Sequence, residues 1–263
     1  MTITKNIIVP GKHEKPILTD VFYSNVNTSK PLIIFCHGYK GFKDWGAWDL
    51  MARAFADAGF FFIKFNFSYN GGTVEQPIDF PDLDAFGNNN YTKELDDLET
   101  VIDWVYSNSD FEKEIDLTNI NLIGHSRAGG IVTIKAEEDY RIKKVVSLAG
   151  VCDFGKRTAT IGDVDTWKKE GVKYVLNGRT KQHMPHIFQF YKNFIDNEER
   201  LTIKRSVCKL KIPYLIIHGN ADTSVLIDEA KKLKQWNSKN EFITIDGANH
   251  VFGASHPWNT NQL

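Results

Sequence analysis

Ser126 lies in a stretch whose composition can make a serine hydroxyl reactive. Residues 121–130 read Asn-Leu-Ile-Gly-His-Ser-Arg-Ala-Gly-Gly and join a short apolar run to a helix-like segment at 131–138. A serine is a poor nucleophile unless it is held clear of the fold, beside a base and near donors for an oxyanion. A sharp turn from a strand into a helix does this, and it requires small residues two positions before and after the serine. Gly124 and Ala128 occupy those positions, although the pattern usually has glycine at the second.

The serine motif alone has a second interpretation. A glycine-rich connection between a strand and a helix, with Ser126 as a helix cap, would contain the same residues. Other polar residues of the chain must therefore decide between a nucleophile and a cap.

Two such residues follow strand-like runs later in the sequence. Asp222 ends the stretch His-Gly-Asn-Ala-Asp after the run 214–217, and His250 ends Gly-Ala-Asn-His after the run 242–245. Each alone has an ordinary explanation, Asp222 as a helix cap and His250 as a surface residue. Ser126, Asp222 and His250 together, each in a turn after a strand, predict a nucleophile, acid and base of one catalytic triad.

Alternating strand and helix patterns predict the scaffold that positions these residues. Strand composition is found in eight runs: 3–9, 17–23, 32–36, 60–65, 120–123, 145–148, 214–217 and 242–245. Helical periodicity lies between them, with Asn90 as the expected cap of one helix and Thr223 or Ser224 as the cap of another. This alternation predicts right-handed crossovers and a mostly parallel sheet, with working residues at the carboxyl ends of the strands.

Two segments do not fit the alternation. Residues 66–89 form a long loop rich in Gly, Asn, Asp and Pro, of the kind that is usually functional or disordered. Residues 153–212 contain helical pieces at 167–176 and 185–195, and we interpret them as a small helical lid, too short to be a second domain. The sequence therefore predicts a single α/β domain over residues 1–263 with this lid inserted.

Composition excludes several classes of protein. The formal net charge is −1 with both signs interspersed, so neither a nucleic acid nor a membrane surface is an expected partner. The N-terminus lacks a secretory pattern, and no apolar run is long enough to span a membrane. Cys36, Cys152 and Cys208 are an odd number without close spacing, which indicates reduced thiols and a cytoplasmic protein. No metal-ligand spacing or phosphate-binding loop is found, so neither a metal nor another cofactor is expected.

The motifs resemble those of the α/β-hydrolase family over residues 32–252. They are His-Gly-Tyr-Lys-Gly at 37–41, Gly-His-Ser-Arg at 124–127, His-Gly-x-x-Asp at 218–222 and Gly-Ala-Asn-His-x-Phe-Gly at 247–253. The chain looks most similar to bacterial carboxylesterases, such as feruloyl and cinnamoyl esterases, and to the hydrolase domains of prolyl-oligopeptidase-like enzymes. The resemblance implies an α/β-hydrolase fold with an eight-stranded, mostly parallel sheet flanked by helices, and a serine hydrolase activity. The order Ser, Asp, His along the chain agrees with this family.

The resemblance also implies roles for residues around the triad. The backbone N–H groups of Tyr39 and Arg127 would form the oxyanion hole. His37 would brace its loop, and His125 would point into the fold or the pocket wall. The Arg127 side chain would form a structural salt bridge or, alternatively, pair with an anionic group of a substrate.

Six residues are candidates for contact with an apolar or aromatic acyl group, because they lie in the expected loops or lid. They are Trp45, Trp48, Tyr69, His183, Met184 and His186. The alternative, that most of them pack the lid onto the core, has equal support.

Three functions remain open from the sequence. The first is a hydrolase of small or aromatic acyl esters, with a small-molecule ester as its partner. The second is a peptidase of the prolyl-oligopeptidase type, and the third is a non-catalytic binding protein on the same scaffold. One departure from the family is the region after His250, where His256-Pro257-Trp258 is not a helix pattern although the family usually has a final helix. Two alternatives would explain this, a truncated chain or a different last element. With truncation, we expect one face of the strand at 242–245 to be bare and the His250 loop to be loosely held.

Overall fold

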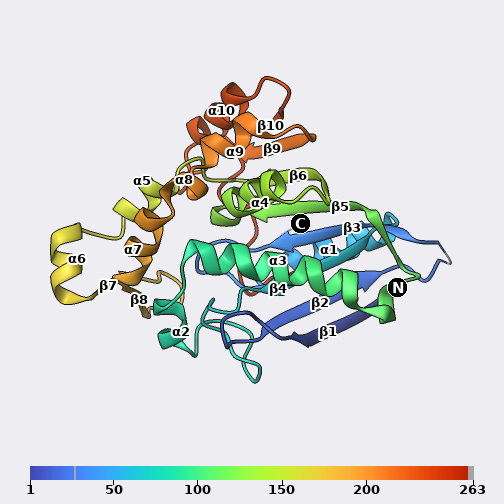
Figure 1. Cartoon of the computed structure of the whole chain (residues 1–263), viewed down its shortest axis with the longest axis horizontal. Helices are drawn as coiled ribbons and strands as arrows, with labels where there is room; N and C mark the ends of the chain where they lie inside the picture. Colours follow the sequence, from blue (N-terminus) through green and yellow to red (C-terminus); the bar gives the residue numbers. More distant parts are fainter. Residues whose placement is uncertain (27, 260–263) are drawn as a thin grey trace.

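Among the residues that the structure describes, 1–26 and 28–259, a sheet of eight strands forms the centre (Figure 1). The structure is a computed structural model. The strand order is β1-β2-β4-β3-β5-β6-β9-β10, and all neighbouring pairs are parallel except β1–β2 and β2–β4. The strands are β1 (Thr2–Val9), β2 (Ile17–Tyr23), β3 (Lys30–Cys36), β4 (Phe61–Asn66), β5 (Ile115–His125), β6 (Ile142–Leu148), β9 (Tyr214–Gly219) and β10 (Glu241–Ile245). The eight expected strands and the mostly parallel sheet are confirmed.

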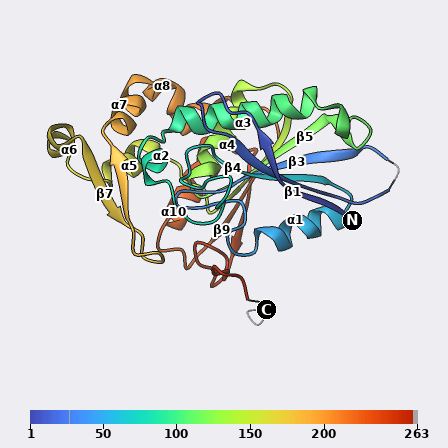
Figure 2. The same cartoon turned by 90° about the horizontal axis from the view of Figure 1, so that it is seen from below.

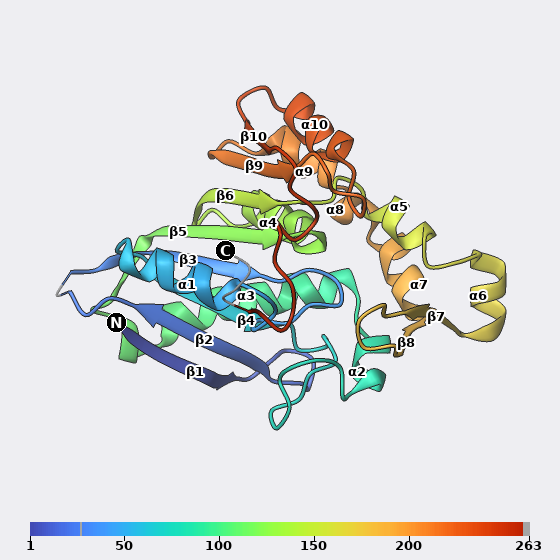
Figure 3. The same ribbon diagram turned by 180° about the vertical axis from the view of Figure 1, so that it is seen from behind.

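Helices cover both faces of the sheet (Figures 2 and 3). One face carries α3 (Tyr91–Ser107), α4 (Arg127–Glu138), α9 (Ile203–Lys209) and α10 (Ile227–Trp236), whose apolar side chains share one core with the sheet. The other face carries α1 (Trp48–Asp57), which packs on the opposite side chains of the same strands. Strand β3 shows the division, because Ile34 faces the first core and Phe35 faces the second.

The central strands explain why the sheet could be recognised from its apolar runs. All six residues of β4 are buried, and only Pro31 of β3 is partly exposed. A strand buried on both faces has no polar alternation, and so it appears in the sequence as a continuous apolar run. Burying each large apolar side chain of this kind contributes about 1.5–3 kcal/mol.

The loop of residues 66–89 is fixed by side chains that bond to the backbone. Asn66 Oδ1 accepts from the Lys43 N–H at 2.6 Å, and Asn70 Nδ2 donates to the Gly41 carbonyl at 3.2 Å. Near its end the loop forms the short helix α2 (Leu83–Gly87), where Asp82 caps the first turn. These bonds connect the loop to residues 41–43, which belong to the connection after β3.

The insertion between β6 and β9 contains a β-hairpin as well as helices. It consists of α5 (Phe154–Ala159), α6 (Val164–Glu170), β7 (Val172–Leu176), β8 (His183–Ile187), α7 (Gln189–Asp196), α8 (Glu198–Leu201) and α9. The helices expected at 167–176 and 185–195 are therefore wrong in part, because strands occupy 172–176 and 183–187. Gly171 ends α6 at φ 77°, a left-handed conformation that glycine adopts without strain, and the chain then turns into the hairpin. In Figure 1 the hairpin and α6 lie at one end of the molecule.

The two helix-cap predictions had different outcomes. The Asn90 side chain accepts from the Lys93 N–H and caps α3, as expected. The cap expected from Thr223 or Ser224 is wrong, because α10 begins after Leu226 without a side-chain cap. The N–H groups in this turn bond instead to the carboxylate of Asp222.

The edge of the sheet formed by β10 is exposed to solvent. Among the described residues after β10, which end at 259, no helix is formed. Four of the five residues of β10 are exposed, including Ile243 and Ile245, so the strand is bare as expected. Within residues 1–26 and 28–259, no helix has both the length and the apolar character needed to cross a membrane.

Candidate active site

Ser126 lies at the tight turn between β5 and α4. Its backbone has φ 58° and ψ −119°, a conformation that costs a non-glycine residue about 1–3 kcal/mol and is typical of functional sites. The turn is so tight that a Cβ on Gly124 would lie 2.2 Å from the Ala128 carbonyl oxygen. The Ser126 N–H donates to the Leu148 carbonyl at 2.9 Å, and the Ser126 carbonyl accepts from the Gly129 N–H at 3.0 Å. The Ala128 methyl group is fully buried, so the turn tolerates alanine in place of glycine.

The structure brings Ser126, His250 and Asp222 into one hydrogen-bonded chain. Ser126 Oγ lies 2.9 Å from His250 Nε2, and Nδ1 of the same ring lies 2.7 Å from Asp222 Oδ2. The three residues follow β5, β10 and β9, so they meet beyond the carboxyl ends of parallel strands. Both distances are within the reach that proton transfer requires.

The Asp222 carboxylate is held in its ionised form. It is buried, and its Oδ1 accepts hydrogen bonds from the N–H groups of Ser224 and Val225, at 2.8 and 2.9 Å. Burial alone would raise the pKa of Asp222, but the Val225 N–H, the His250 ring and the Ser224 N–H together lower it below its usual value. A charged carboxylate is therefore available to orient the imidazole.

Two buried histidines support the loops of the site. His125 Nε2 lies 2.8 Å from the His250 carbonyl, and since a carbonyl only accepts, His125 donates this hydrogen bond. His37 Nε2 accepts from the Phe67 N–H at 3.3 Å, and its Nδ1 lies 2.9 Å from the Gly38 carbonyl. Burial lowers the pKa of His125 to about 3 and that of His37 to about 4, so both rings are neutral at pH 7. His37 thus braces its loop, and His125 holds the segment that carries His250, which is therefore not loosely held.

The loop after β3 packs directly on the turn that carries Ser126. A Cβ on Gly38 would lie 2.8 Å from the Ser126 Cβ and 2.9 Å from the His125 carbonyl oxygen, so the approach requires glycine. Tyr39 follows Gly38 and Arg127 follows Ser126, so both of their N–H groups lie at this contact. Within the described part of the chain, neither N–H bonds to a backbone carbonyl. Two such donors beside a serine hydroxyl can bind a developing oxyanion.

The Arg127 side chain forms a buried ion pair. Its Nη1 lies 3.3 Å from Glu94 Oε1, which also accepts from Asn89 Nδ2 at 2.8 Å. Burial raises the pKa of Glu94, and the positive charge of Arg127 acts in the opposite direction. Of the two roles expected for Arg127, the structure contains the salt bridge. Glu94 and Asn89 were not foreseen, and the one sequence signal for Glu94 was an acid beside the apolar stripe of its helix.

Of the six residues expected to contact substrate, Trp48 lies against His125, which precedes Ser126, and Trp45 and His186 lie against Trp48 and Tyr39. The Trp48 ring centroid lies 5.2 Å from that of His125 and 6.2 Å from that of Trp45, whose ring is tilted by 42°. His186 Nε2 lies 3.0 Å from Tyr39 Oη. Trp48 and His186 are themselves buried, so these contacts pack α1 and the insertion against residues near Ser126.

The other three have different surroundings. Met184 is fully buried in a small apolar cluster with Phe42, Phe80 and Phe86, so it packs the insertion onto the loops below it. Tyr69 donates to the His13 carbonyl at 2.7 Å, and His183 is exposed at the start of β8. No contact joins Tyr69 or His183 to the serine site within the described residues.

Two hollows lie among the loops that follow β3 and β4. A cavity of about 240 Å³ lies under the loop of residues 66–82, and its walls include Lys15, Asn70 and Asp82. The triad does not line this cavity. A smaller hollow of about 10 Å³, the size of one water molecule, lies behind Tyr39 between Arg127 and other residues of the loop after β3.

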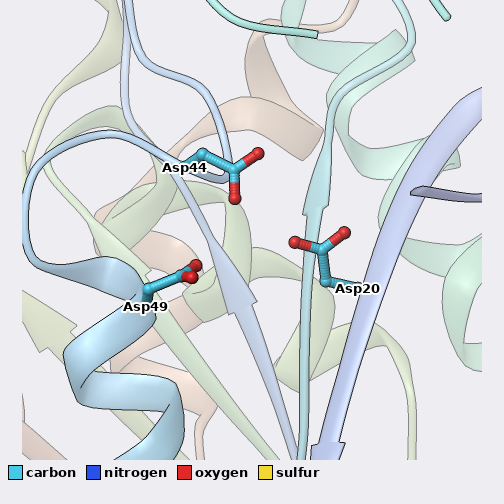
Figure 4. Close-up of side chains that lie close together, drawn as sticks. All are labelled: Asp20, Asp44 and Asp49. Carbon is cyan, nitrogen blue, oxygen red and sulfur yellow. The ribbon is translucent and has the colours of Figure 1, made fainter. Parts of the chain in front are cut away.

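Three carboxylates gather at a separate place, where β2 and the start of α1 approach each other (Figure 4). Asp20, Asp44 and Asp49 each have an oxygen atom within 4.8 Å of the others. Cations that prefer oxygen ligands, such as Ca²⁺ and Mg²⁺, bind to groups of carboxylates of this kind. However, Nζ of Lys43 and Nζ of Lys64 both lie 2.8 Å from Asp20 oxygens, and Lys64 also lies 2.5 Å from Asp44. Burial alone would raise the pKa of Asp44, but Lys64 and Lys43 hold it well below its usual range. The lysines supply the positive charge, so the cluster is a buried ion-pair network.

Comparison with known proteins agrees with the fold. A family model described as alpha/beta hydrolase fold matches residues 31–204. The chain belongs to the alpha/beta hydrolase fold family. The matched range contains the Tyr39 loop and Ser126, while Asp222 and His250 lie beyond it.

Solved structures of similar fold include esterases. Est1E from Butyrivibrio proteoclasticus superposes with a TM-score of 0.70 at 16% identity, covering 95% of this chain and 91% of Est1E, which has also been solved with ferulic acid bound. An esterase domain from Rhodothermus marinus superposes with a TM-score of 0.65 at 19% identity, covering 100% of this chain and 93% of that domain. An uncharacterised 31.7 kDa protein of Escherichia coli is 31% identical over 128 residues, which are 48% of this chain and 40% of that protein. The match thus spans less than half of this curated relative.

Proposed function

We propose that this alpha/beta hydrolase is a serine esterase that cleaves carboxylic esters through an acyl-serine intermediate. The observation that carries the proposal is the chain of hydrogen bonds from Ser126 Oγ to His250 at 2.9 Å and from His250 to Asp222 at 2.7 Å. The strained backbone of Ser126 and the two N–H groups beside it support the same conclusion.

Acylation would begin with attack of Ser126 Oγ on the ester carbonyl carbon. His250 Nε2 takes the serine proton as the new C–O bond forms, and Asp222 stabilises the imidazolium. The tetrahedral intermediate then collapses, the bond to the alcohol oxygen breaks, and His250 donates its proton to the leaving alcohol.

Deacylation would repeat these steps with water in place of the alcohol. His250 takes a proton from the water as its oxygen attacks the acyl-serine carbonyl. The acid product leaves, and the proton returns to Ser126. In both steps the oxyanion accepts from the N–H groups of Tyr39 and Arg127, and loss of one such donor typically lowers kcat by roughly 10²–10³-fold.

The surroundings support small or aromatic acyl groups as substrates. Trp45, Trp48, Tyr39 and His186 place aromatic rings beside the loops that carry the serine. Such rings favour apolar, flat groups over charged ones. The insertion at 153–212 would act as a lid that presents His186 to this region.

The test is a panel of p-nitrophenyl esters of increasing acyl length, together with methyl ferulate and a peptide anilide. We expect the wild type to hydrolyse short or aromatic esters much faster than the anilide. Ser126→Ala should remove this activity without changing the melting temperature. Faster turnover of the anilide would favour a peptidase, and unchanged ester turnover in Ser126→Ala would exclude the proposed nucleophile.

A further inference from the structure

The side chains of the two proposed oxyanion-hole residues are in contact with each other. The guanidinium carbon of Arg127 lies 4.3 Å from the centroid of the Tyr39 ring, which is stacking distance for a cation and an aromatic face. Tyr39 belongs to the loop after β3, and Arg127 opens α4. The contact therefore joins the two separate segments whose N–H groups would bind the oxyanion.

Both members of the stack are anchored at their far ends. Glu94, on α3, holds the Arg127 guanidinium at 3.3 Å, and both side chains are almost fully buried, with 5% and 12% of their surface exposed. Tyr39 Oη lies 3.0 Å from His186 Nε2, which comes from β8 of the insertion. One continuous chain of contacts thus runs from α3 through both oxyanion-hole residues to the insertion.

The hydrogen bonds of the Tyr39 loop involve residues on either side of Tyr39. His37 Nδ1 and the Gly41 N–H both donate to the Gly38 carbonyl, and Asn70 Nδ2 donates to the Gly41 carbonyl. Gly38 and Gly41 flank the loop, and Lys40 has φ 54°, a conformation that turns the backbone sharply. Glycines of this kind allow close approach to Ser126 but add backbone freedom. The contact of the Tyr39 ring with the Arg127 guanidinium adds a direct constraint on the distance between the Tyr39 N–H and the Arg127 N–H.

The hydrogen bond between Tyr39 and His186 does not depend on pH near neutrality. Burial raises the pKa of Tyr39 to about 12, and burial with the nearby Arg127 lowers the pKa of His186 to about 3. Phenol and imidazole therefore stay neutral between these values, and their hydrogen bond persists over the working pH range.

We propose that the stacked side chains of Tyr39 and Arg127 act as a clamp that positions the oxyanion hole, and that His186 ties this clamp to the insertion. The proposal rests on the serine esterase function proposed above. In it the two side chains are positioning groups, because they set where their own N–H groups point and do not themselves contact the reacting atoms. A positioning group of this kind should affect the transition state more than the bound substrate.

The test compares Arg127→Met and Tyr39→Leu, which break the stack, with Tyr39→Phe, which keeps the ring and loses the bond to His186. We expect the first two to lower kcat by roughly 10–100-fold while KM changes by less than about 3-fold, because misplacing a donor weakens transition-state binding. Tyr39→Phe should show a smaller loss. A trifluoromethyl ketone, which forms an oxyanion when the serine adds to it, should lose affinity by the same factor as kcat/KM in each variant.

Arg141→Met is the matched control. Arg141 lies beyond the opposite end of α4, with its guanidinium carbon 5.0 Å from the Tyr106 ring and its ion pairs to Asp139 and Asp103. It loses the same kinds of contact away from the site, so it should lower stability without changing kcat or inhibitor affinity.

A separate comparison of variants tests the hydrogen bond between Tyr39 and His186 of the insertion. Tyr39→Phe and His186→Leu should each lower kcat, and the double variant should be no worse than the stronger single variant, because both remove one hydrogen bond. Additive losses would overturn the link to the insertion.

Several results would overturn the clamp. Unchanged kcat and inhibitor affinity in both Arg127→Met and Tyr39→Leu would do so, as would a rise in KM confined to anionic esters, which would assign Arg127 to substrate binding. If these variants do not fold, Arg127→Lys carries the test, because it keeps a positive charge for Glu94 and loses the planar group that stacks on the Tyr39 ring. A wild type that neither hydrolyses esters nor reacts with a serine probe would instead refute the proposed function, so the two failures are distinguishable.

Discussion

Replacing Asp222 by asparagine should give a folded protein with almost no esterase activity. The two oxygens of this carboxylate have different partners. Oδ1 accepts from the N–H groups of Ser224 and Val225 at 2.8 and 2.9 Å, and Oδ2 faces His250 Nδ1 at 2.7 Å. An asparagine would keep its oxygen beside the two N–H donors, because its NH2 group cannot accept from them. The NH2 group would then face the imidazole.

This orientation would reverse the roles of the imidazole nitrogens. Since the NH2 group only donates, His250 Nδ1 would have to accept, and the proton of the neutral ring would move to Nε2. Nε2 lies 2.9 Å from Ser126 Oγ, so the ring could no longer take the serine proton. A wrong tautomer of this kind lowers kcat by roughly 10⁴-fold, which corresponds to about 5 kcal/mol of activation free energy.

The assay is steady-state hydrolysis of a p-nitrophenyl ester by the wild type, Asp222→Asn and a control, Asp246→Asn. Asp246 is exposed, follows β10 and accepts from Asn220 Nδ2 at 2.7 Å, so it undergoes the same chemical change near the site without touching the triad. Thermal unfolding would verify that both variants fold. Activity of Asp222→Asn within about tenfold of the wild type would refute the reasoning, because such a residual rate leaves no room for a lost base.

Two further predictions concern packing and pH. Gly38→Ala should lower kcat and reduce the free energy of unfolding by about 1–3 kcal/mol, because the added methyl group would lie 2.8 Å from the Ser126 Cβ; kinetics and urea unfolding would measure both. Burial raises the pKa of Asp97 from 3.8 to about 7, and its carboxylate accepts from the Ser68 N–H at 2.8 Å. Because the folded state then binds the proton more tightly than the unfolded state, the free energy of unfolding should fall by up to roughly 4 kcal/mol as the pH rises from about 4 to about 7. Asp97→Asn should remove this dependence, which urea unfolding at pH 5 and pH 8 would detect.

Each of these has a contrary result. A Gly38→Ala protein with wild-type kcat and stability would mean that the loop does not need the close approach. An equal change in stability with pH in the wild type and in Asp97→Asn would assign the titration to another group.

The sheet and the meeting of Ser126, Asp222 and His250 could be predicted because their signals are local. Strands β3 and β4 are buried on both faces, so their sequences are largely apolar, with Leu32–Cys36 continuous and β4 interrupted by Lys64. Ser126, Asp222 and His250 each follow a strand-like run, and parallel strands bring their carboxyl ends together whatever the connecting segments do. The cap of α3 was likewise visible, because Asn90 is adjacent to the helix that it caps.

The hairpin of the insertion was missed because its residues are ambiguous at short range. Residues 172–176 read Val-Lys-Tyr-Val-Leu and fit either a strand or the end of a helix. Pro185 favours a helix start, but it pairs with Tyr174 in a two-stranded sheet, where a proline can face outward at an edge. The choice depends on tertiary pairing, which the sequence does not display.

The contacts that support the oxyanion loop are also tertiary. The pairs Arg127–Glu94 and Tyr39–His186 join segments far apart in the chain, and nothing in the spacing of these residues links them. The turn at Asp222 shows a related difficulty. Thr223 and Ser224 are good caps by type, but the aspartate beside them takes the available N–H groups.

The most direct test of the proposed chemistry is reaction of the wild-type protein with a fluorophosphonate probe, followed by mass spectrometry of the digested protein. We expect one adduct, on Ser126, and none in Ser126→Ala. Ester hydrolysis by a folded wild type that remains unlabelled, or that is labelled at a different residue, would contradict the assignment of Ser126 as the nucleophile.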